Sequence, residues 1–413
     1  MGIFVFLMVL VILGGLLLQM RRRAERAIRR LSSRARGLPR GSDVPIGDRQ
    51  GALGFPPPDQ IAPRRPLPGS RLRPQSPSQR EKLAALGLPI LETTNDVLGF
   101  LRLDLRAFLA LANPSDCIRP ARTNYYEWSV SKKRGGVRII CAPKPRLKAI
   151  QQRIKAEILD RVPLHDAAHG FVRRRNIVSN ATPHVGQPIV INLDLRDFFG
   201  HITYQRVYAV FRRLGYSREV TRCLSWLCTH RPNLCPVIFP DLPNSDLRRP
   251  ARHAVQGAPT SPALANLVAD QIDRRCTGLA KKFNCTYTRY ADDLTFSGGE
   301  PFKRGLSRFI PLIRRIIPDE LFQLHLPKQR FMRSSERQEV TGVIVNSRPN
   351  LARDRFDRLK AILHNAAKAG SLESQNRSGI ANFRAYLLGQ ISHVRLLNPQ
   401  RGARLLQVIN AIP

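Results

Sequence analysis

The chain has 413 residues, which is enough for two or three domains with a substantial apolar core. It carries 68 Lys and Arg against 30 Asp and Glu, so a surface this basic needs a polyanion or an anionic membrane opposite it, and nucleic acid is the default partner. The seven cysteines include no C-x-x-C pair and are odd in number. This excludes an obvious disulfide scaffold and indicates reduced thiols in an intracellular protein.

The first twenty residues are predicted to be a membrane anchor helix (1–20). Residues 2–18 carry no charge, and their number is near the lower limit of the roughly 17–25 residues that span a bilayer. Arg21, Arg22 and Arg23 follow at once, so the positive-inside rule places the rest of the chain in the cytoplasm. A wrongly chosen start codon or a buried helix is the alternative.

Residues 21–78 are predicted to be a linker, because they are rich in arginine and proline and show no apolar periodicity. Residues 79–112 have apolar side chains at near-helical spacing and are predicted to be helical.

A basic hairpin is predicted next. Residues 125–130 and 137–142 read as two strands around the glycine turn 132–136. Arg138 stands inside the return strand, and with Lys133 in the turn it could reach a triphosphate.

A buried strand then leads to the first candidate catalytic acid. Ile189 to Leu193 is nearly all apolar, as in a strand buried on both faces, and Asp194 ends it. Asp197 is expected to cap the next helix, which is predicted over 204–230.

The middle of the chain has little pattern until a turn opens a helix. Residues 231–254 are a proline-rich insertion of unknown role, within which Cys235 forms no usual zinc-ligand spacing with Cys223, Cys228 and His230. We therefore expect buried thiols there. Residues 256–262 are a turn before a helix, and its backbone N–H groups and Gln256 would face a ligand.

Residues 285–297 are predicted to be a β-hairpin with Asp292 and Asp293 at its tip. Adjacent carboxylates repel, so a fold keeps them only with a strong compensator, for which a divalent cation is the best candidate. A solvated turn is the alternative. Together with Asp194, the pair suits a site for two Mg²⁺ ions that clamp the attacking and leaving oxygens of a phosphoryl transfer.

The C-terminal part follows with a helix over 301–317, Lys328 on a loop or edge strand, and a strand pair over 338–346. Three helices are predicted from residue 352 to the end of the chain, and a basic helical bundle suits a surface that grips a nucleic-acid duplex.

The motifs resemble those of reverse transcriptases. Tyr290-Ala-Asp-Asp293 is similar to the family's catalytic tetrapeptide, and Asp194 matches its first catalytic Asp. Phe199 matches the aromatic gate that rejects a 2′-hydroxyl. The resemblance further implies nucleotide-binding roles for Lys133, Arg138, Phe199, Gln256 and Lys328, the last as a proton donor to leaving pyrophosphate.

Two further patterns are similar to retron-type signatures: Asn180-Ala-x-x-His184 and Val340-Thr-Gly342. The resemblance covers residues ~120–410 and includes a thumb motif. It implies a set of RNA-binding or subfamily residues: Asn180, His184, Val340, Thr341, Gly342, Arg384 and Arg395.

The resemblance implies an α+β fold of the right-hand polymerase type. Fingers and palm, with an antiparallel sheet and helices, would occupy residues 79–345, and a helical thumb residues 346–413. Such an enzyme takes dNTPs, binds a cognate structured non-coding RNA and the RNA–DNA hybrid, and primes single-stranded DNA (retron msDNA) from an RNA 2′-hydroxyl. Retron systems act in anti-phage defence, with an effector protein as a further partner.

The expected location is the bacterial inner membrane, or the cytoplasm if the anchor is not real. Two alternatives stay open for the function. One is a reverse transcriptase of group II intron type or of untemplated defence type. The other is a non-catalytic, membrane-tethered RNA-binding protein.

Overall fold

The computed structural model describes residues 79–112, 123–131, 137–232 and 251–412. No helix among these residues is both long and apolar enough to cross a bilayer. The predicted anchor and linker, Lys133, and most of the 231–254 insertion lie outside the described residues.

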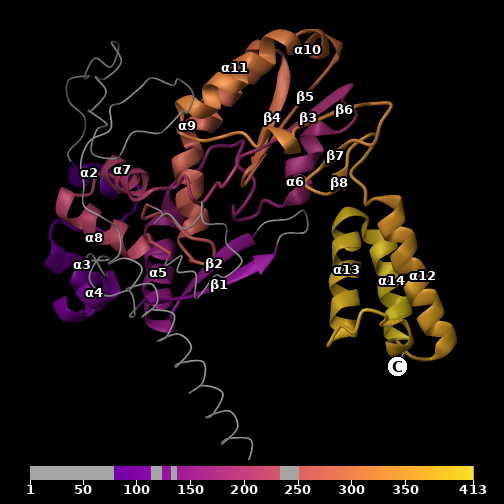
Figure 1. Cartoon of the computed structure of the whole chain (residues 1–413), viewed down its shortest axis with the longest axis horizontal. Helices are drawn as coiled ribbons and strands as arrows, with labels where there is room; N and C mark the ends of the chain where they lie inside the picture. Colours follow the sequence, from indigo (N-terminus) through magenta and orange to yellow (C-terminus); the bar gives the residue numbers. More distant parts are fainter. Residues whose placement is uncertain (1–78, 113–122, 132–136, 233–250, 413) are drawn as a thin grey trace, which may run out of the picture. The chain divides into compact units, whose positions relative to one another are not determined.

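The central feature is a four-stranded antiparallel sheet with the order β4-β5-β3-β6 (Figure 1). The strands come from three separate parts of the chain. They are β3 (Ile189–Asp194), β4 (Cys285–Tyr290), β5 (Asp293–Gly298) and β6 (Arg330–Arg333).

Strand β3 is buried on both faces, as its apolar run predicts. Its residues Ile189, Ile191 and Leu193 enter the large core, and Val190 faces a smaller cluster that includes Val340. The alternation follows the two-residue period of a strand. Residues 190, 192 and 194 therefore share the face opposite the large core.

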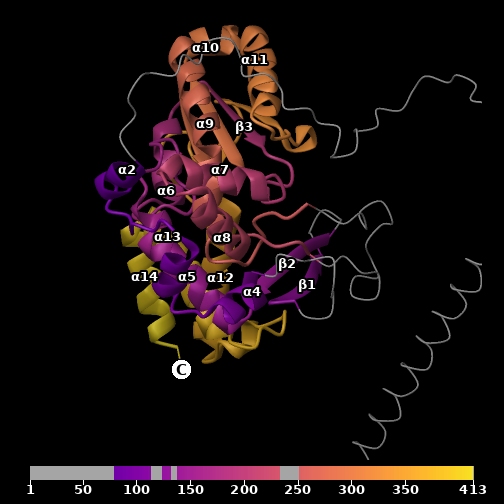
Figure 2. The same cartoon turned by 90° about the vertical axis from the view of Figure 1, so that its left-hand side faces the viewer.

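Helices cover the core face of the sheet. The long helix α9 (Ser261–Lys282) packs against β4. Helix α11 (Leu306–Asp319) packs against α9 and lies beside it in Figures 1 and 2. The short helix α10 (Glu300–Arg304) contacts β5. Buried side chains of α9 and α11 and of β3 and β5 form one continuous core.

Among the described residues, the elements that precede the sheet are helices and one hairpin. The hairpin pairs β1 (Tyr125–Ser131) with β2 (Val137–Pro143), as predicted. The helices are α2 (Gln79–Ala85), α3 (Thr94–Leu101), α4 (Leu105–Ala112), α5 (Pro145–Glu157) and α6 (Ile177–Ala181).

Two helices, α7 (Tyr204–Leu214) and α8 (Arg218–Cys228), replace the single helix predicted over 204–230. Gly215 ends α7 with φ 115°, a conformation that glycine adopts without steric cost. Ser217 then caps α8 by accepting a hydrogen bond from the Val220 N–H.

The prediction that Asp197 caps the helix after β3 is wrong. Thr203 is the residue that precedes α7, and Asp197 lies in a tight turn with φ 45°. The Asp197 carbonyl accepts hydrogen bonds from the backbone and ring nitrogens of His201.

Beyond the sheet, the two-residue strands β7 (Glu339–Val340) and β8 (Val343–Ile344) form a small hairpin. The chain ends in three mutually packed helices with their own apolar core. These are α12 (Arg353–Ala369), α13 (Phe383–Leu397) and α14 (Pro399–Asn410).

Candidate active site

Strand pairing brings the predicted catalytic acids together. Asp194 ends β3 and lies directly opposite Asp293, the first residue of β5. Opposite residues of an antiparallel pair point to the same face, with Cα atoms roughly 4.5–5.5 Å apart. A slip of one residue would turn one carboxylate to the other face. The register therefore determines whether these acids meet.

Asp292 reaches the same place through the tip of the β4–β5 hairpin. Tyr290 pairs with Asp293, so Ala291 and Asp292 form a two-residue loop. The carbonyl of Asp292 accepts a hydrogen bond of 2.9 Å from the Leu195 N–H, which ties the tip to the chain just after β3. Ala291 has φ 56°, a left-handed conformation that strains a residue with a Cβ and is typical of functional sites.

The acids repel one another in the metal-free chain. Burial raises the pKa of Asp293 to about 7, and the charges of Asp292 and Asp194 add to the effect. Burial also raises the pKa of Asp292, with a further contribution from Asp194. A cation in the site would remove both the repulsion and the pKa shift.

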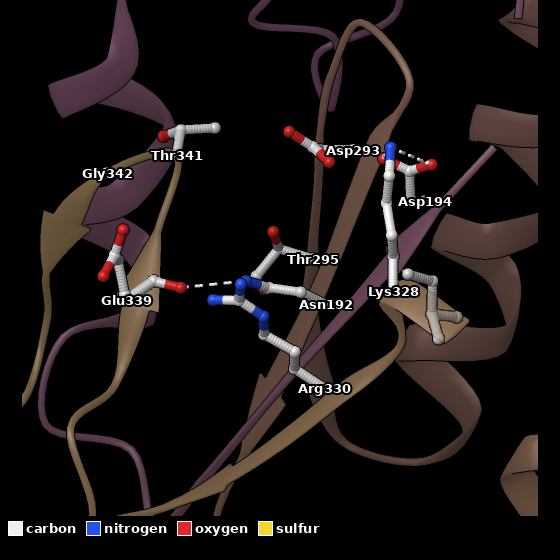
Figure 3. A pocket seen from close by; sticks show the side chains of 10 residues that line it. Asn192, Asp194, Asp293, Thr295, Lys328, Arg330, Glu339, Thr341 and Gly342 are labelled. Carbon is white, nitrogen blue, oxygen red and sulfur yellow. Dashed lines mark hydrogen bonds and ion pairs between the residues drawn. The ribbon is translucent and has the colours of Figure 1, made fainter. Parts of the chain in front are cut away.

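The Lys328 ammonium group offsets part of the negative charge of the three acids. Its Nζ lies 2.9 and 3.0 Å from the two carboxylate oxygens of Asp194 (Figure 3). The resemblance to reverse transcriptases implies a place for Lys328 near the leaving pyrophosphate, and the structure brings Lys328 to the acid cluster.

The donor set fits Mg²⁺, which prefers oxygen ligands and holds few carboxylates together with water and substrate phosphates. The carboxylate oxygens of Asp194, Asp292 and Asp293 do not all lie within 4.8 Å of one another. Among the described residues, the group of possible ligands whose atoms all lie within 4.8 Å of one another is Glu127, Cys141 and His230. In that group Glu127 and His230 are already in direct contact at 2.6 Å.

A cavity of about 180 Å³ opens beside the acids (Figure 3). Asp194, Asp293 and Lys328 line one side, and the β7–β8 turn lines the other. Sequence reasoning missed four polar residues of its wall: Asn192, Thr295, Arg330 and Glu339. Their positions on alternate residues of β3 and β5 are the signal that could have found two of them.

Some of the predicted nucleotide-binding residues lie near the acids, and others do not contact them or lie outside the described residues. Arg138 is exposed on β2, and its charge lowers the pKa of Asp292 against the effect of burial. Lys133 lies outside the described residues. Phe199 is half-buried and contacts the rings of Phe198 and Phe171.

Gln256 is held against the hairpin β1–β2. Its carbonyl accepts a hydrogen bond of 2.8 Å from the Cys141 N–H. Gly257 follows with φ 110°, and a Cβ there would lie 3.0 Å from the Cys141 carbonyl. The motif needs glycine at this position for two independent reasons, backbone conformation and close approach.

The first retron-type signature is structural in its contacts. Asn180 and His184 are fully buried, so they make no direct contact with RNA in this conformation. His184 bonds the hydroxyls of Ser297 and Thr288, and burial lowers its pKa to about 3, which keeps the ring neutral. These contacts brace the back of the β4–β5 hairpin.

The second signature forms the β7–β8 turn. Thr341 and Gly342 have φ 47° and 84°, as in the type I′ turns that close two-residue hairpins. Val340 is fully buried, so its side chain packs in the core in this conformation, whereas Thr341 and Gly342 line the cavity. The Thr341 hydroxyl lies 3.4 Å from the Asn180 side-chain nitrogen, so the two signatures touch.

The two arginines predicted to bind RNA differ in exposure and in their contacts. Arg384 is half-buried and donates to the carbonyls of Ile409 and Ile412, so it secures the end of α14. Arg395 is exposed on α13 and faces solvent.

Sequence reasoning also missed a buried ionic network behind the hairpin. Arg289 and Asp273 are both 0% exposed and form a two-point ion pair. An arginine directly before the Tyr290 motif, and an aspartate seven residues after Asn266 on the same helix face, were the available signals.

The cysteines agree with the expectation of buried thiols. Cys223 and Cys228 are free and buried, and Cys235 lies outside the described residues.

Comparison with known proteins gives the family. A model described as reverse transcriptase (RNA-dependent DNA polymerase) matches residues 130–345. The retron Mx65 reverse transcriptase of Myxococcus xanthus is 39% identical over 78% of this chain and 73% of its own length. The retron Mx162 enzyme of the same organism is 32% identical over 80% and 69%, and the retron Ec86 enzyme of Escherichia coli is 30% identical over 76% and 91%. The chain therefore belongs to the reverse transcriptase family, as a retron-type RNA-directed DNA polymerase.

Proposed function

We propose that this enzyme copies a cognate structured non-coding RNA into single-stranded DNA, starting from a 2′-hydroxyl of that RNA. In the first step the 2′-oxygen bonds to the α-phosphorus of a dNTP and pyrophosphate leaves. In later steps the 3′-oxygen of the growing DNA is the nucleophile. The resemblance of the two signatures to retron-type enzymes supports this choice of primer.

The observation that carries the proposal is the pairing of Asp194 with Asp293, with Lys328 on the same acid cluster. Asp194, Asp292 and Asp293 would hold two Mg²⁺ ions, which supply positive charge to the attacking and leaving oxygens. Lys328 would orient the triphosphate and give a proton to the leaving pyrophosphate.

Three more side chains would select and hold the nucleotide. Arg138 would bind the triphosphate, because it is the exposed cation of β2 whose charge reaches Asp292. Phe199 would stack below the sugar and exclude a 2′-hydroxyl, and Gln256 would contact the sugar from the turn before α9.

Sequencing the nucleic acid that copurifies with the full chain tests this proposal. A DNA strand joined covalently to an RNA at a 2′-position, with matching sequence, is the expected result. Intron RNA would indicate the group II type, DNA that matches no RNA would indicate untemplated synthesis, and RNA without DNA would indicate a non-catalytic binding protein.

Asp292→Asn tests the acid cluster. The substitution keeps the size of the side chain and removes a charged ligand, so we expect DNA synthesis to be abolished while RNA binding survives. Primer extension measures the first and filter binding the second. Unchanged synthesis would rule out the metal mechanism.

We also propose a membrane tether and a role in anti-phage defence with an effector protein. The uncharged run 2–18 before three arginines supports the tether. Cell fractionation should find the full chain with membranes, and deletion of residues 2–18 should release it. Phage plating with the intact enzyme and with Asp292→Asn tests defence.

A further inference from the structure

A buried polar network lies behind the hairpin that carries Asp292 and Asp293. Arg289 on β4 donates from Nε and Nη2 to the two oxygens of Asp273 on α9, at 2.8 and 2.6 Å. The Tyr287 hydroxyl donates to the same carboxylate at 2.8 Å. Burial opposes the charge on Arg289, but Asp273 outweighs it and raises the pKa of the guanidinium above its usual value.

The third guanidinium nitrogen reaches the tip of the hairpin. Nη1 of Arg289 donates to the carbonyl of Ala291 at 3.1 Å and to the side-chain oxygen of Asn266 at 3.0 Å. Ala291 is the residue with φ 56° immediately before Asp292. A strained backbone conformation persists only where surrounding contacts impose it. Arg289 provides such a contact at the Ala291 carbonyl, directly before the acid pair.

Asn266 extends the network to a second chain segment. Its side-chain nitrogen donates to the carbonyl of Gly170 at 2.9 Å. A Cβ at Gly170 would lie 2.4 Å from the Ala291 nitrogen, so this segment presses directly on the tip. The backbone N–H of His169 donates to the Arg289 carbonyl at 2.7 Å, which is a second bond between this segment and β4.

The network also connects the acids to the nucleotide-binding turn. Asn266 and Asp273 lie on α9, which begins at Ser261 directly after the Gln256 turn. They are seven residues apart and so occupy the same helix face. The buried Arg289 guanidinium bonds both to Asp273 and Asn266 on α9 and to the Ala291 carbonyl beside the acid pair. A shift of α9 would therefore also shift the acid pair.

We propose that Arg289, Asp273 and Asn266 are positioning residues that set where Asp292 and Asp293 lie relative to Asp194, and hence how tightly the acids bind a divalent cation. This rests on the proposed function of the acid cluster. None of the three touches the reacting atoms. They act through the Ala291 carbonyl and the Gly170 segment.

Direct binding of Mn²⁺ to the full chain without nucleotide tests the proposal. The EPR signal of free Mn²⁺ reports the dissociation constant independently of activity. Asn266→Ala removes the bonds to Arg289 and Gly170 but leaves the Arg289–Asp273 pair in place, so we expect the variant to fold. We expect Mn²⁺ binding about 10-fold weaker, in the range of about 10- to 100-fold found for groups that orient metal ligands.

Asn376→Ala is the matched control. The Asn376 side chain makes three hydrogen bonds, to Glu373 and to the backbone of Ile380, against the two of Asn266, and it lies between α12 and α13. We expect wild-type Mn²⁺ binding in this variant. Wild-type binding in Asn266→Ala, at a thermal midpoint that shows it is folded, would overturn the proposal.

Asn266→Asp separates the two bonds of Asn266. It keeps an acceptor for Arg289 and loses the donor to Gly170, so Mn²⁺ binding should fall between that of wild type and that of Asn266→Ala. Equal losses in the two variants would assign the effect to Gly170 alone and overturn the role of Arg289. If wild type binds Mn²⁺ at the acids but makes no DNA, the proposed function fails while this inference stands.

Discussion

The sheet region and the C-terminal helices are built on different principles. In α12–α14, the buried side chains of the described residues are apolar and follow one face of each helix, such as Leu359, Leu363 and Ala366 on α12. Around β3–β5, the core buries charge, including the Arg289–Asp273 pair. An apolar stripe is sufficient to hold helices together. Buried charge is difficult to stabilise, and its presence here coincides with the acids that must be held in place.

The largest expected effect separates these two kinds of core. Arg289→Leu leaves the Asp273 carboxylate buried without its partner, so the free energy of unfolding should fall by about 3–5 kcal/mol. Arg289→Leu combined with Asp273→Leu should recover much of that stability, but Mn²⁺ binding should stay weak. Chemical denaturation and EPR measure the two quantities. Recovery of both together would mean that the pair serves only stability.

Leu387→Ala provides the counterpart in the helices. Leu387 is fully buried on α13, and removing a buried leucine side chain costs about 2–5 kcal/mol. Hydrogen exchange in α12–α14 should increase, and Mn²⁺ binding should not change. A loss of Mn²⁺ binding would show that the two regions are coupled more strongly than their separate cores suggest.

The pH dependence of stability should also belong to the sheet region. Asp293 has a folded-state pKa of about 7 against an ordinary value of 3.8, so the folded metal-free chain binds more protons between these values. Its stability should therefore fall as pH rises from about 4 to about 7. Asp293→Asn should flatten this slope and, above pH 7, raise the thermal midpoint of the metal-free protein. An unchanged slope would place the ionisation elsewhere.

The smallest effect compares two glycines with the same conformational demand. Gly342 in the β7–β8 turn and Gly370 at the end of α12 have φ 84° and 66°, and neither has an atom within 4 Å of an added Cβ. Substitution by alanine should cost about 1 kcal/mol at either site, because only backbone strain is involved. DNA synthesis should decrease in Gly342→Ala alone, because that turn lines the cavity beside Asp293. Equal DNA synthesis by Gly342→Ala and Gly370→Ala would show that the β7–β8 turn has no part in the reaction.

Much of the local structure was predictable. The apolar run before Asp194 predicted a strand buried on both faces, and the three helices predicted from residue 352 onward are present as α12, α13 and α14. Helix boundaries were less accurate, because Gly215 and Gly305 divide helices that apolar periodicity alone reads as continuous. The buried partners of Arg289 were not predicted, since a charged residue in a strand is usually solvated, although Asn266 and Asp273 lie seven residues apart on one helix face.

By itself, the amino-acid sequence determined the local elements and the chemical character of the site: which segments form strands and helices, and which oxygens are available to a cation. Those features depend on side-chain periodicity and on motifs a few residues long. Only the tertiary structure decided that Asp194 faces Asp293, that Lys328 reaches Asp194, and that His184 braces the hairpin from within the core. Each of these depends on strand register and on contacts between residues about 100 or more positions apart, which local pattern does not encode.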